Sequence, residues 1–258
     1  MPTGGLGVVV TGAGHGIGRA IARRAAADGA RVVVNDLDAA AAQRVAREVG
    51  GLAVPGDAAG DPGVDALVTR AALHLGRIDV YFANAGVDVG GGLSAPESDW
   101  DRALEVNVRA HVRAARRLIP TWLEQGGGRF VVTASAAGLL TMLGSAPYSV
   151  SKHAAVAFAE WLSATYGHRG IVVQALCPQG VRTRMLDDAG PAQELLAHER
   201  VLEPDDVAEC AWQALRDDRF LVLPHGEVAD YYARRASDTD RWLGGMRKLQ
   251  IRLDGAVS

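Results

Sequence analysis

Two residues four positions apart, Tyr148 and Lys152, have the types and spacing best suited to acid–base chemistry. If their segment is helical, side chains at this spacing lie on one face. A phenol with a pKa of ~10 is a poor base at neutral pH, and a neighbouring ammonium stabilises the phenolate and lowers that pKa. The pair alone has little specificity, because helices produce it by chance. The plain alternative is an exposed helical pair.

A glycine-rich segment near the N-terminus has the composition of a phosphate-binding turn. It follows a β-branched run and opens an apolar stretch with helical periodicity, and it reads Thr11-Gly12-Ala13-Gly14-His15-Gly16-Ile17-Gly18. Glycines there let the backbone turn tightly and approach a pyrophosphate, whose charge is attracted by the N–H groups at the helix start. The strand before it and the helix after it favour this interpretation over an ordinary tight turn.

Asp36, at the end of the second β-branched run, is the acidic residue that accompanies such a turn. A carboxylate at this place accepts hydrogen bonds from the adenosine ribose and repels a 2′-phosphate. Neither Leu37 nor His15 offers the cation that a 2′-phosphate requires. We therefore expect NAD rather than NADP; the alternative is a surface aspartate that ends a strand.

The elements that position these residues are predicted by short β-branched runs alternating with Ala- and Arg-rich amphipathic stretches, which is typical of a parallel sheet with crossover helices. Most strands are unbroken apolar runs, as expected where helices cover both faces. The strands are expected at Gly7–Val10, Arg31–Asn35, Leu52–Pro55, Ile78–Ala83, Gly128–Thr133, Ile171–Cys177 and Arg219–Leu223. The helices are expected at Ile17–Ala27, Asp38–Val49, Gly63–His74, Asp99–Trp122, Tyr148–Tyr166 and Asp205–Arg216.

The fold class expected is α/β: a Rossmann-like, doubly wound, seven-stranded parallel sheet in one domain, residues 1–258. Because ligands bind at the carboxyl ends of parallel strands, the irregular segment 182–200 is a candidate substrate lid. Residues 224–258 form a C-terminal extension of one or two helices. Its apolar side chains need a surface to cover, so it packs on this or a neighbouring subunit or closes over an active site; these side chains are Tyr231, Tyr232, Trp242, Leu243, Met246 and Leu249.

Composition narrows the classes of function. The 258 residues carry a net charge of −3, so no basic excess points to nucleic acid or to an acidic membrane surface. No apolar run approaches the ~20 residues of a membrane helix, and no signal peptide is evident. Two cysteines without a CxxC pattern, Cys177 and Cys210, fit a reducing setting, so we expect a cytoplasmic protein. The seven histidines show no metal-ligand spacing, so we expect no metal.

Taken together, these motifs resemble those of the short-chain dehydrogenase/reductase family over most of the chain. The family's glycine turn appears at Thr11–Gly18, and its Asn-Ala-Gly signature appears as Asn84, Ala85 and Gly86. Its helix asparagine, its serine after the fifth strand and its Tyr-x-x-x-Lys pair match Asn107, Ser135, Tyr148 and Lys152. Five motifs in the family's order and spacing are far more specific than any one of them.

The resemblance implies a role for each catalytic residue. Tyr148 would exchange a proton with the substrate oxygen as general acid or base, and Ser135 would hydrogen-bond that oxygen. Lys152 would bind the nicotinamide ribose and depress the pKa of the tyrosine. Asn107 would hold a water that relays protons from the lysine to solvent; without the other motifs it would be an ordinary helix amide.

The resemblance also places the cofactor. Asp57, with Ala58 beside it, resembles the family's contact to the adenine amino group, and Asp61 is the alternative. The full set of implied cofactor-binding residues is Gly12, Gly14, His15, Gly16, Ile17, Gly18, Asp36, Leu37, Asp57, Ala58, Asn84, Ala85, Gly86, Tyr148, Lys152, Pro178, Val181 and Thr183.

The segment after the sixth strand departs from the family pattern. Gln179 stands where the family usually has glycine, so its side chain is expected either to shape the substrate pocket or to turn to solvent. Together with Gln179, the expected substrate contacts are Ser135, Leu140 and Met185. An apolar pocket for a hydrophobic substrate is indicated by Leu139, Leu140, Met142, Met185 and Leu186.

The function expected is an NAD(H)-dependent oxidoreductase that interconverts a secondary alcohol and a ketone. The alternatives are an NADPH-dependent carbonyl reductase and a non-catalytic NAD-sensing protein of the same fold. Ala-rich helices at 99–122 and 148–166 resemble those that pair between subunits of the family, so a homotetramer or homodimer is expected. No nucleic-acid or membrane partner is expected.

Overall fold

The computed structural model describes residues 5–187 and 201–256, and a parallel seven-stranded sheet in the order β3-β2-β1-β4-β5-β6-β7 forms its centre. All seven expected strands are present and the fold class is confirmed. Between β1 and β4 the order of the strands reverses, and ligands of open α/β sheets bind at such a point. The strands are β1 Gly7–Val10, β2 Arg31–Val34, β3 Leu52–Ala53, β4 Val80–Ala83, β5 Gly128–Thr133, β6 Ile171–Leu176 and β7 Leu221–Val222.

Several strands are shorter than expected, and β4 shows a physical reason. The prediction began this strand at Ile78, whereas the ladder begins at Val80. The Asp79 side chain accepts a hydrogen bond of 2.7 Å from the N–H of Gly7, so a carboxylate replaces a strand carbonyl there. At the edges of the sheet, β3 and β7 have two residues each.

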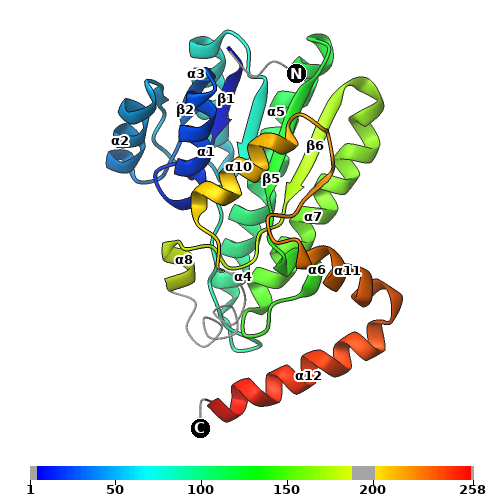
Figure 1. Cartoon of the computed structure of the whole chain (residues 1–258). Coiled ribbons are helices and arrows are strands. Elements are labelled where there is room, and N and C mark those ends of the chain that lie inside the picture. The colour runs from blue at the N-terminus through cyan, green and yellow to red at the C-terminus, as the bar shows by residue number, and fades with distance from the viewer. Residues whose placement is uncertain (1–4, 188–200, 257–258) are drawn as a thin grey trace.

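Helices cover both faces of the sheet, as the apolar strand sequences predict (Figure 1). On one face lie α1 Gly16–Ala27, α2 Ala39–Val49 and α10 Pro204–Ala214. On the other lie α3 Asp61–Leu75, α5 Ala110–Glu124 and α7 Ala146–Tyr166. Each layer buries its own apolar cluster against the sheet, so the carboxyl ends of the strands are held in fixed positions.

The helix expected at 99–122 is present, but it is interrupted by a π-helical turn. The chain forms α4 Glu97–Leu104, then a π-helical turn at Glu105–Arg109, and only then α5. A π turn inserts an extra residue into the helix, a rare feature that is frequent at functional sites. Asn107 lies in the middle of this turn. Within the described residues, shorter helices that were not predicted are α6 Ala137–Leu140, a 3₁₀ turn at Gly167–Arg169 and α8 Arg184–Asp187.

The C-terminal extension forms two helices, α11 Glu227–Ser237 and α12 Thr239–Ala256. The buried Val228 packs α11 onto the domain, and the Arg235 guanidinium donates a hydrogen bond to the carbonyl of Leu139 in α6. Beyond it, α12 extends away from the body (Figure 1). Of the candidate lid 182–200, residues 188–200 lie outside the described residues. Over the described ranges, no helix is long and apolar enough to cross a membrane.

Candidate active site

A cavity of about 1690 Å³ runs along the carboxyl ends of the strands, from the start of α1 to the inner side of α12. It brings together residues that are far apart in the sequence, from Gly12 to Arg252. The expected catalytic residues, cofactor-binding residues and substrate contacts all line this cavity except Asn107, which is fully buried behind its wall. The structure thus places the glycine turn, the Tyr–Lys pair and the expected substrate contacts at one site.

The glycine turn is shaped to take a phosphate group. Gly12 has a φ of +60°, and a Cβ there would lie 2.9 Å from the Cα of Ala85, so only glycine fits. Behind it, a Cβ at Gly18 would overlap the carbonyl of Gly12. Helix α1 begins at Gly16 without a side-chain cap at His15, so no side chain competes for its first N–H groups. These residues fit the pyrophosphate of a dinucleotide.

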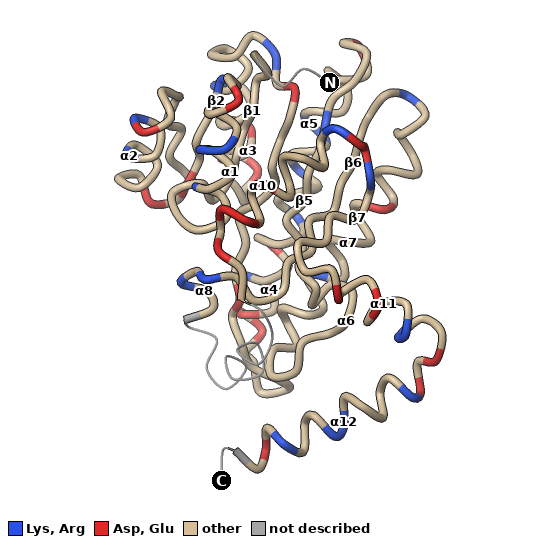
Figure 2. Tube along the Cα trace, viewed as in Figure 1, with Lys and Arg blue, Asp and Glu red and all other residues tan. Residues whose placement is uncertain are grey.

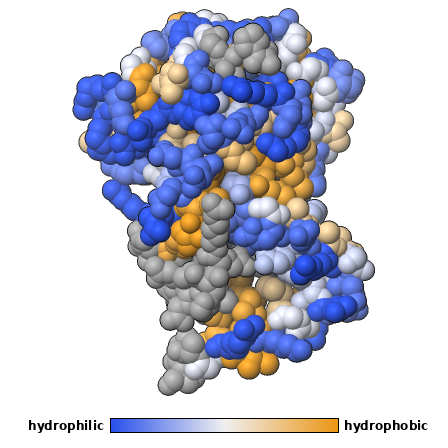
Figure 3. Space-filling model, viewed as in Figure 1, coloured by the Kyte–Doolittle hydropathy of each residue, from blue (hydrophilic) through white to orange (hydrophobic). Residues whose placement is uncertain are grey.

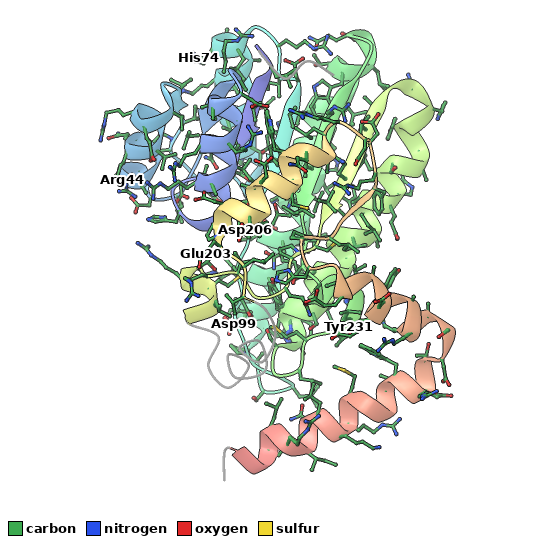
Figure 4. The ribbon with its side chains drawn as sticks, viewed as in Figure 1. Arg44, His74, Asp99, Glu203, Asp206 and Tyr231 are labelled. Carbon is green, nitrogen blue, oxygen red and sulfur yellow. The ribbon has the colours of Figure 1, made fainter. Side chains whose placement is uncertain are left out.

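Asp36 stabilises the same turn. One carboxylate oxygen accepts a hydrogen bond of 2.8 Å from the N–H of Gly14, and the other accepts one of 2.9 Å from the N–H of Asp38. Leu37 is exposed at the cavity. Arg44 of α2 also lines the cavity (Figure 4). No local pattern indicated this, because Arg44 lies eight residues after Asp36 and reaches the cavity only through the packing of α2.

Asn84 joins β4 to the glycine turn. Its amide donates to the carbonyl of Thr11 at 2.9 Å, and its own N–H donates to the hydroxyl of Thr11 at 2.9 Å. A neighbouring loop holds Asp57, whose carboxylate accepts from the N–H groups of Ala59 and Gly60. Asp57 therefore faces the cavity with its carboxylate already oriented by the backbone.

The catalytic candidates come from β5 and α7. Lys152 is buried, and its Nζ donates a hydrogen bond of 2.9 Å to the carbonyl of Thr133 at the end of β5. The same Nζ lies 5.6 Å from the centroid of the Tyr148 ring. Ser135 hydrogen-bonds the phenol and accepts a bond from the N–H of Ala137, which starts α6. Helix α7 thus presents the phenol and the ammonium on one face, beside the serine hydroxyl.

Burial has the largest effect on the pKa of the Tyr148 phenol in the protein alone, and the expected lowering by the ammonium stays a prediction. Burial raises the pKa of Tyr148 to about 12, and the hydrogen bond from Ser135 offsets only part of that rise. Burial also lowers the pKa of Lys152 to about 8, although Cys177 and Asp88 act to raise it. At neutral pH the phenol is therefore protonated and the lysine is mostly charged.

Asn107 acts on the loop that follows β4. Its Oδ1 accepts from the N–H of Val87 and its Nδ2 donates to the carbonyl of Val87, both at 2.9 Å. The Nδ2 also donates to the hydroxyl of Ser151 in α7. A Cβ at Gly86 would lie 3.2 Å from both Asn107 Oδ1 and Lys152 Nζ, so glycine keeps the backbone close to these groups. The amide of Asn107 therefore ties α7 to the cavity wall; the expected water relay stays a prediction.

The loop after β6 is held by three contacts. The carbonyl of Pro178 accepts hydrogen bonds from the N–H of Ala136 and the hydroxyl of Ser135, which fixes this loop to the end of β5. Gln179 lines the cavity, and its N–H donates to Nδ1 of the buried His225. A Cβ at Gly16 would lie 3.0 Å from Cγ2 of Thr183, so this loop also closes onto the glycine turn.

Two groups near the catalytic end were missed from the sequence. Asp88 lines the cavity and accepts a hydrogen bond of 2.8 Å from the hydroxyl of Ser145. Its position two residues after the Asn-Ala-Gly signature was the available signal. His111 is buried one helical turn beyond Asn107.

The expected substrate side of the cavity is largely apolar. Leu140, Met142, Met185 and Leu186 line it, whereas Leu139 is buried beneath it and was wrongly included. In the described part of the chain, no cluster of three His, Cys, Asp or Glu residues is arranged to hold a metal.

Comparison with known proteins identifies the class. The family model described as short chain dehydrogenase matches residues 7–194. The chain belongs to this family, and as a member it is an oxidoreductase that acts on alcohols or ketones.

Three similar proteins illustrate the relationship. The 1-deoxy-11-beta-hydroxypentalenate dehydrogenase of Streptomyces exfoliatus is 37% identical over 229 residues, covering 85% of this chain and 83% of the relative. The meso-2,3-butanediol dehydrogenase of Serratia marcescens is 35% identical over 226 residues, covering 83% and 89%. A short-chain dehydrogenase/reductase from Burkholderia phymatum, solved in complex with NAD, has a TM-score of 0.86 at 30% identity and covers 93% and 96%.

Proposed function

We propose that this protein is an NAD(H)-dependent oxidoreductase that interconverts a secondary alcohol and a ketone, with Tyr148 as general acid and base. The observation that carries the proposal is the meeting of the phenol, the serine hydroxyl and the buried ammonium in one cavity with the glycine turn. When bound, the nicotinamide accepts or supplies the hydride and, in its oxidised form, adds positive charge near the phenol.

Each residue has a defined task in this proposal. The hydroxyl of Ser135 and Oη of Tyr148 hydrogen-bond the substrate oxygen and orient its carbon. In reduction the phenol, protonated at neutral pH, gives its proton to the oxygen. In oxidation it must first lose that proton, so a nearby positive charge favours the reaction. Lys152 supplies such a charge and a donor for the ribose.

The test is turnover of a panel of secondary alcohols with NAD⁺, followed by absorbance. Replacing Tyr148 by Phe removes the proton donor, so kcat is expected to fall about 10²- to 10⁴-fold while NADH binding, followed by fluorescence, is unchanged. Tyr166→Phe, on the same helix, is the matched control and is expected to keep full activity. Turnover that survives Tyr148→Phe contradicts the proposal, and a wild type that binds NADH without any turnover supports the sensing alternative.

The preference for NAD is proposed from Asp36, whose carboxylate repels a 2′-phosphate. The NADPH alternative is favoured by one observation, because Arg44 offers a guanidinium at the same end of the cavity. We expect tighter binding of NADH than of NADPH, and a smaller difference in Asp36→Ser. A clear preference of the wild type for NADPH rules out the argument from Asp36.

The proposal also covers the oligomeric state and the cellular compartment. The outer face of α7 exposes Val150 and Trp161, which are 49% and 56% exposed. Large exposed apolar side chains on one helix face mark an interface, so we propose a homodimer or homotetramer through α7. Cys177 and Cys210 are free thiols, which fits a reducing cytoplasm.

A further inference from the structure

The cavity continues past the catalytic residues to the two C-terminal helices. There its walls are Tyr231 of α11 and Trp242, Met246 and Leu249 of α12. The three α12 residues are spaced by four and three positions, so they lie on one face of the helix. Figure 3 shows hydrophobic surface where α12 faces the body, and Figure 4 shows Tyr231 on the side of α11 that faces α12. This end of the cavity fits a bulky apolar group.

Two exposed guanidinium groups line the part of the cavity beside these helices, Arg234 on α11 and Arg252 on α12. Basic residues recur along α12 (Figure 2). Within residues 5–187 and 201–256, neither arginine forms an ion pair with a carboxylate. The guanidinium carbon of Arg234 lies 5.9 Å from the centroid of the Tyr231 ring, which holds this cation at the cavity.

The acidic residues that line the cavity all lie elsewhere. Asp36 and Asp57 belong to the cofactor half, and Asp88 lies beside the catalytic residues. The others, Glu105, Glu203 and Asp205, are paired with arginines. Among the described lining residues, none on α11 or α12 is acidic. An apolar wall with two such cations fits an amphipathic anion better than a neutral ligand.

We propose that the substrate is a secondary alcohol, or the corresponding ketone, whose bulky apolar skeleton carries a carboxylate remote from the carbinol carbon; this rests on the function proposed above. Arg234 and Arg252 bind the carboxylate, and Trp242, Met246 and Leu249 contact the skeleton. Guanidinium groups suit this role because they donate two parallel hydrogen bonds to a carboxylate. In oxidation the carbinol C–H gives a hydride to NAD⁺, the O–H gives its proton to the Tyr148 phenolate, and the carboxylate is unchanged.

A matched pair of rigid substrates tests the proposal: 4-hydroxyadamantane-1-carboxylate and its neutral methyl ester, each with NAD⁺. A hydrogen bond to a charged group contributes enough to change affinity about 10- to 100-fold. Arg234→Met and Arg252→Met are therefore each expected to raise KM for the acid at least about tenfold, with kcat unchanged. The ester is expected to be unaffected. Arg247→Met, on the same helix but outside the cavity lining, is the matched control.

Binding without turnover separates this inference from the proposed function. Calorimetry in the presence of NADH compares the binding of adamantane-1-carboxylate with that of adamantane-1-carboxamide. Neither compound has a hydroxyl that can be oxidised, and only the carboxylate is charged. We expect the acid to bind more tightly, and the advantage to disappear in Arg234→Met/Arg252→Met. If alcohols are oxidised but neither arginine affects acids, the inference is overturned and the proposed function stands. If the arginines bind the acid but no alcohol is oxidised, the proposed function fails and the anion site stands.

Discussion

Buried ionisable side chains concentrate around the catalytic end of α7. Lys152 and Tyr148 are both buried. His111 lies near enough to Lys152 for the charge of the lysine to lower the pKa of the imidazole. Among the described residues, neither ring nitrogen of His111 has a hydrogen-bond partner. Burial, with a smaller contribution from Lys152, lowers the pKa of His111 to about 3, so the imidazole stays neutral in the folded protein.

Because the buried imidazole is neutral, we expect the free energy of unfolding to decrease in acid. The unfolded chain takes up a proton at His111 below about pH 6.5, and the folded chain does not until about pH 3, so the free energy of unfolding falls as the pH drops between these values. At pH 5 this loss amounts to about 2 kcal/mol. His111→Leu is expected to remove it, as measured by urea unfolding at pH 7 and pH 5. His74→Leu, at an exposed site (Figure 4), is the control, and equal pH dependence in the two variants contradicts the assignment.

At the scale of elements, the π turn between α4 and α5 is the feature that most affects the site. It places Asn107 opposite the loop after β4 and beside α7. One amide then satisfies the N–H and carbonyl of Val87 and contacts the hydroxyl of Ser151. Buried polar groups left without partners are costly, so this amide joins three elements.

Replacing Asn107 by Ala leaves the polar groups of Val87 and Ser151 without their partner. Each unsatisfied group costs about 1–3 kcal/mol, so we expect a total loss of about 2–4 kcal/mol in the free energy of unfolding. Denaturant titration measures this loss. Val106→Ala, at the neighbouring position in the π turn, serves as the comparison. A loss below about 1 kcal/mol for Asn107→Ala argues against the clamp, since that is no more than one ordinary hydrogen bond.

In the whole molecule, the parallel strands bring the site residues together at one edge of the sheet. The outer face of α7 keeps Val150 and Trp161 exposed. All seven carboxyl ends point to one edge, where the cavity lies. On the opposite side of α7 from Lys152, the ring of Trp161 stacks on Phe158 and remains more than half exposed. The catalytic helix therefore also carries the surface proposed for subunit contact.

A charge at the centre of that surface is expected to separate the subunits. Trp161→Glu places a carboxylate where an apolar face would be buried, which costs several kcal/mol per interface. Sedimentation of wild type and variant measures the mass directly. Trp161→Phe, which keeps an apolar ring, is expected to preserve the oligomer. A wild type that sediments as a monomer, or a Trp161→Glu variant that keeps the oligomer, disproves the interface.

Local sequence patterns sufficed for the seven strands, the alternating helices and the glycine turn, because side-chain periodicity and backbone freedom act over a few residues. The spacing of Tyr148 and Lys152 likewise placed both groups on one face of α7. Only the tertiary structure determined how burial shifts the pKa of each of these two groups. The raised pKa of the phenol depends on elements brought from distant parts of the chain, and so does the π turn at Asn107. The cations of α11 and α12 reach the cavity for the same reason: long-range packing determines which side chains share a wall, and no local pattern records it.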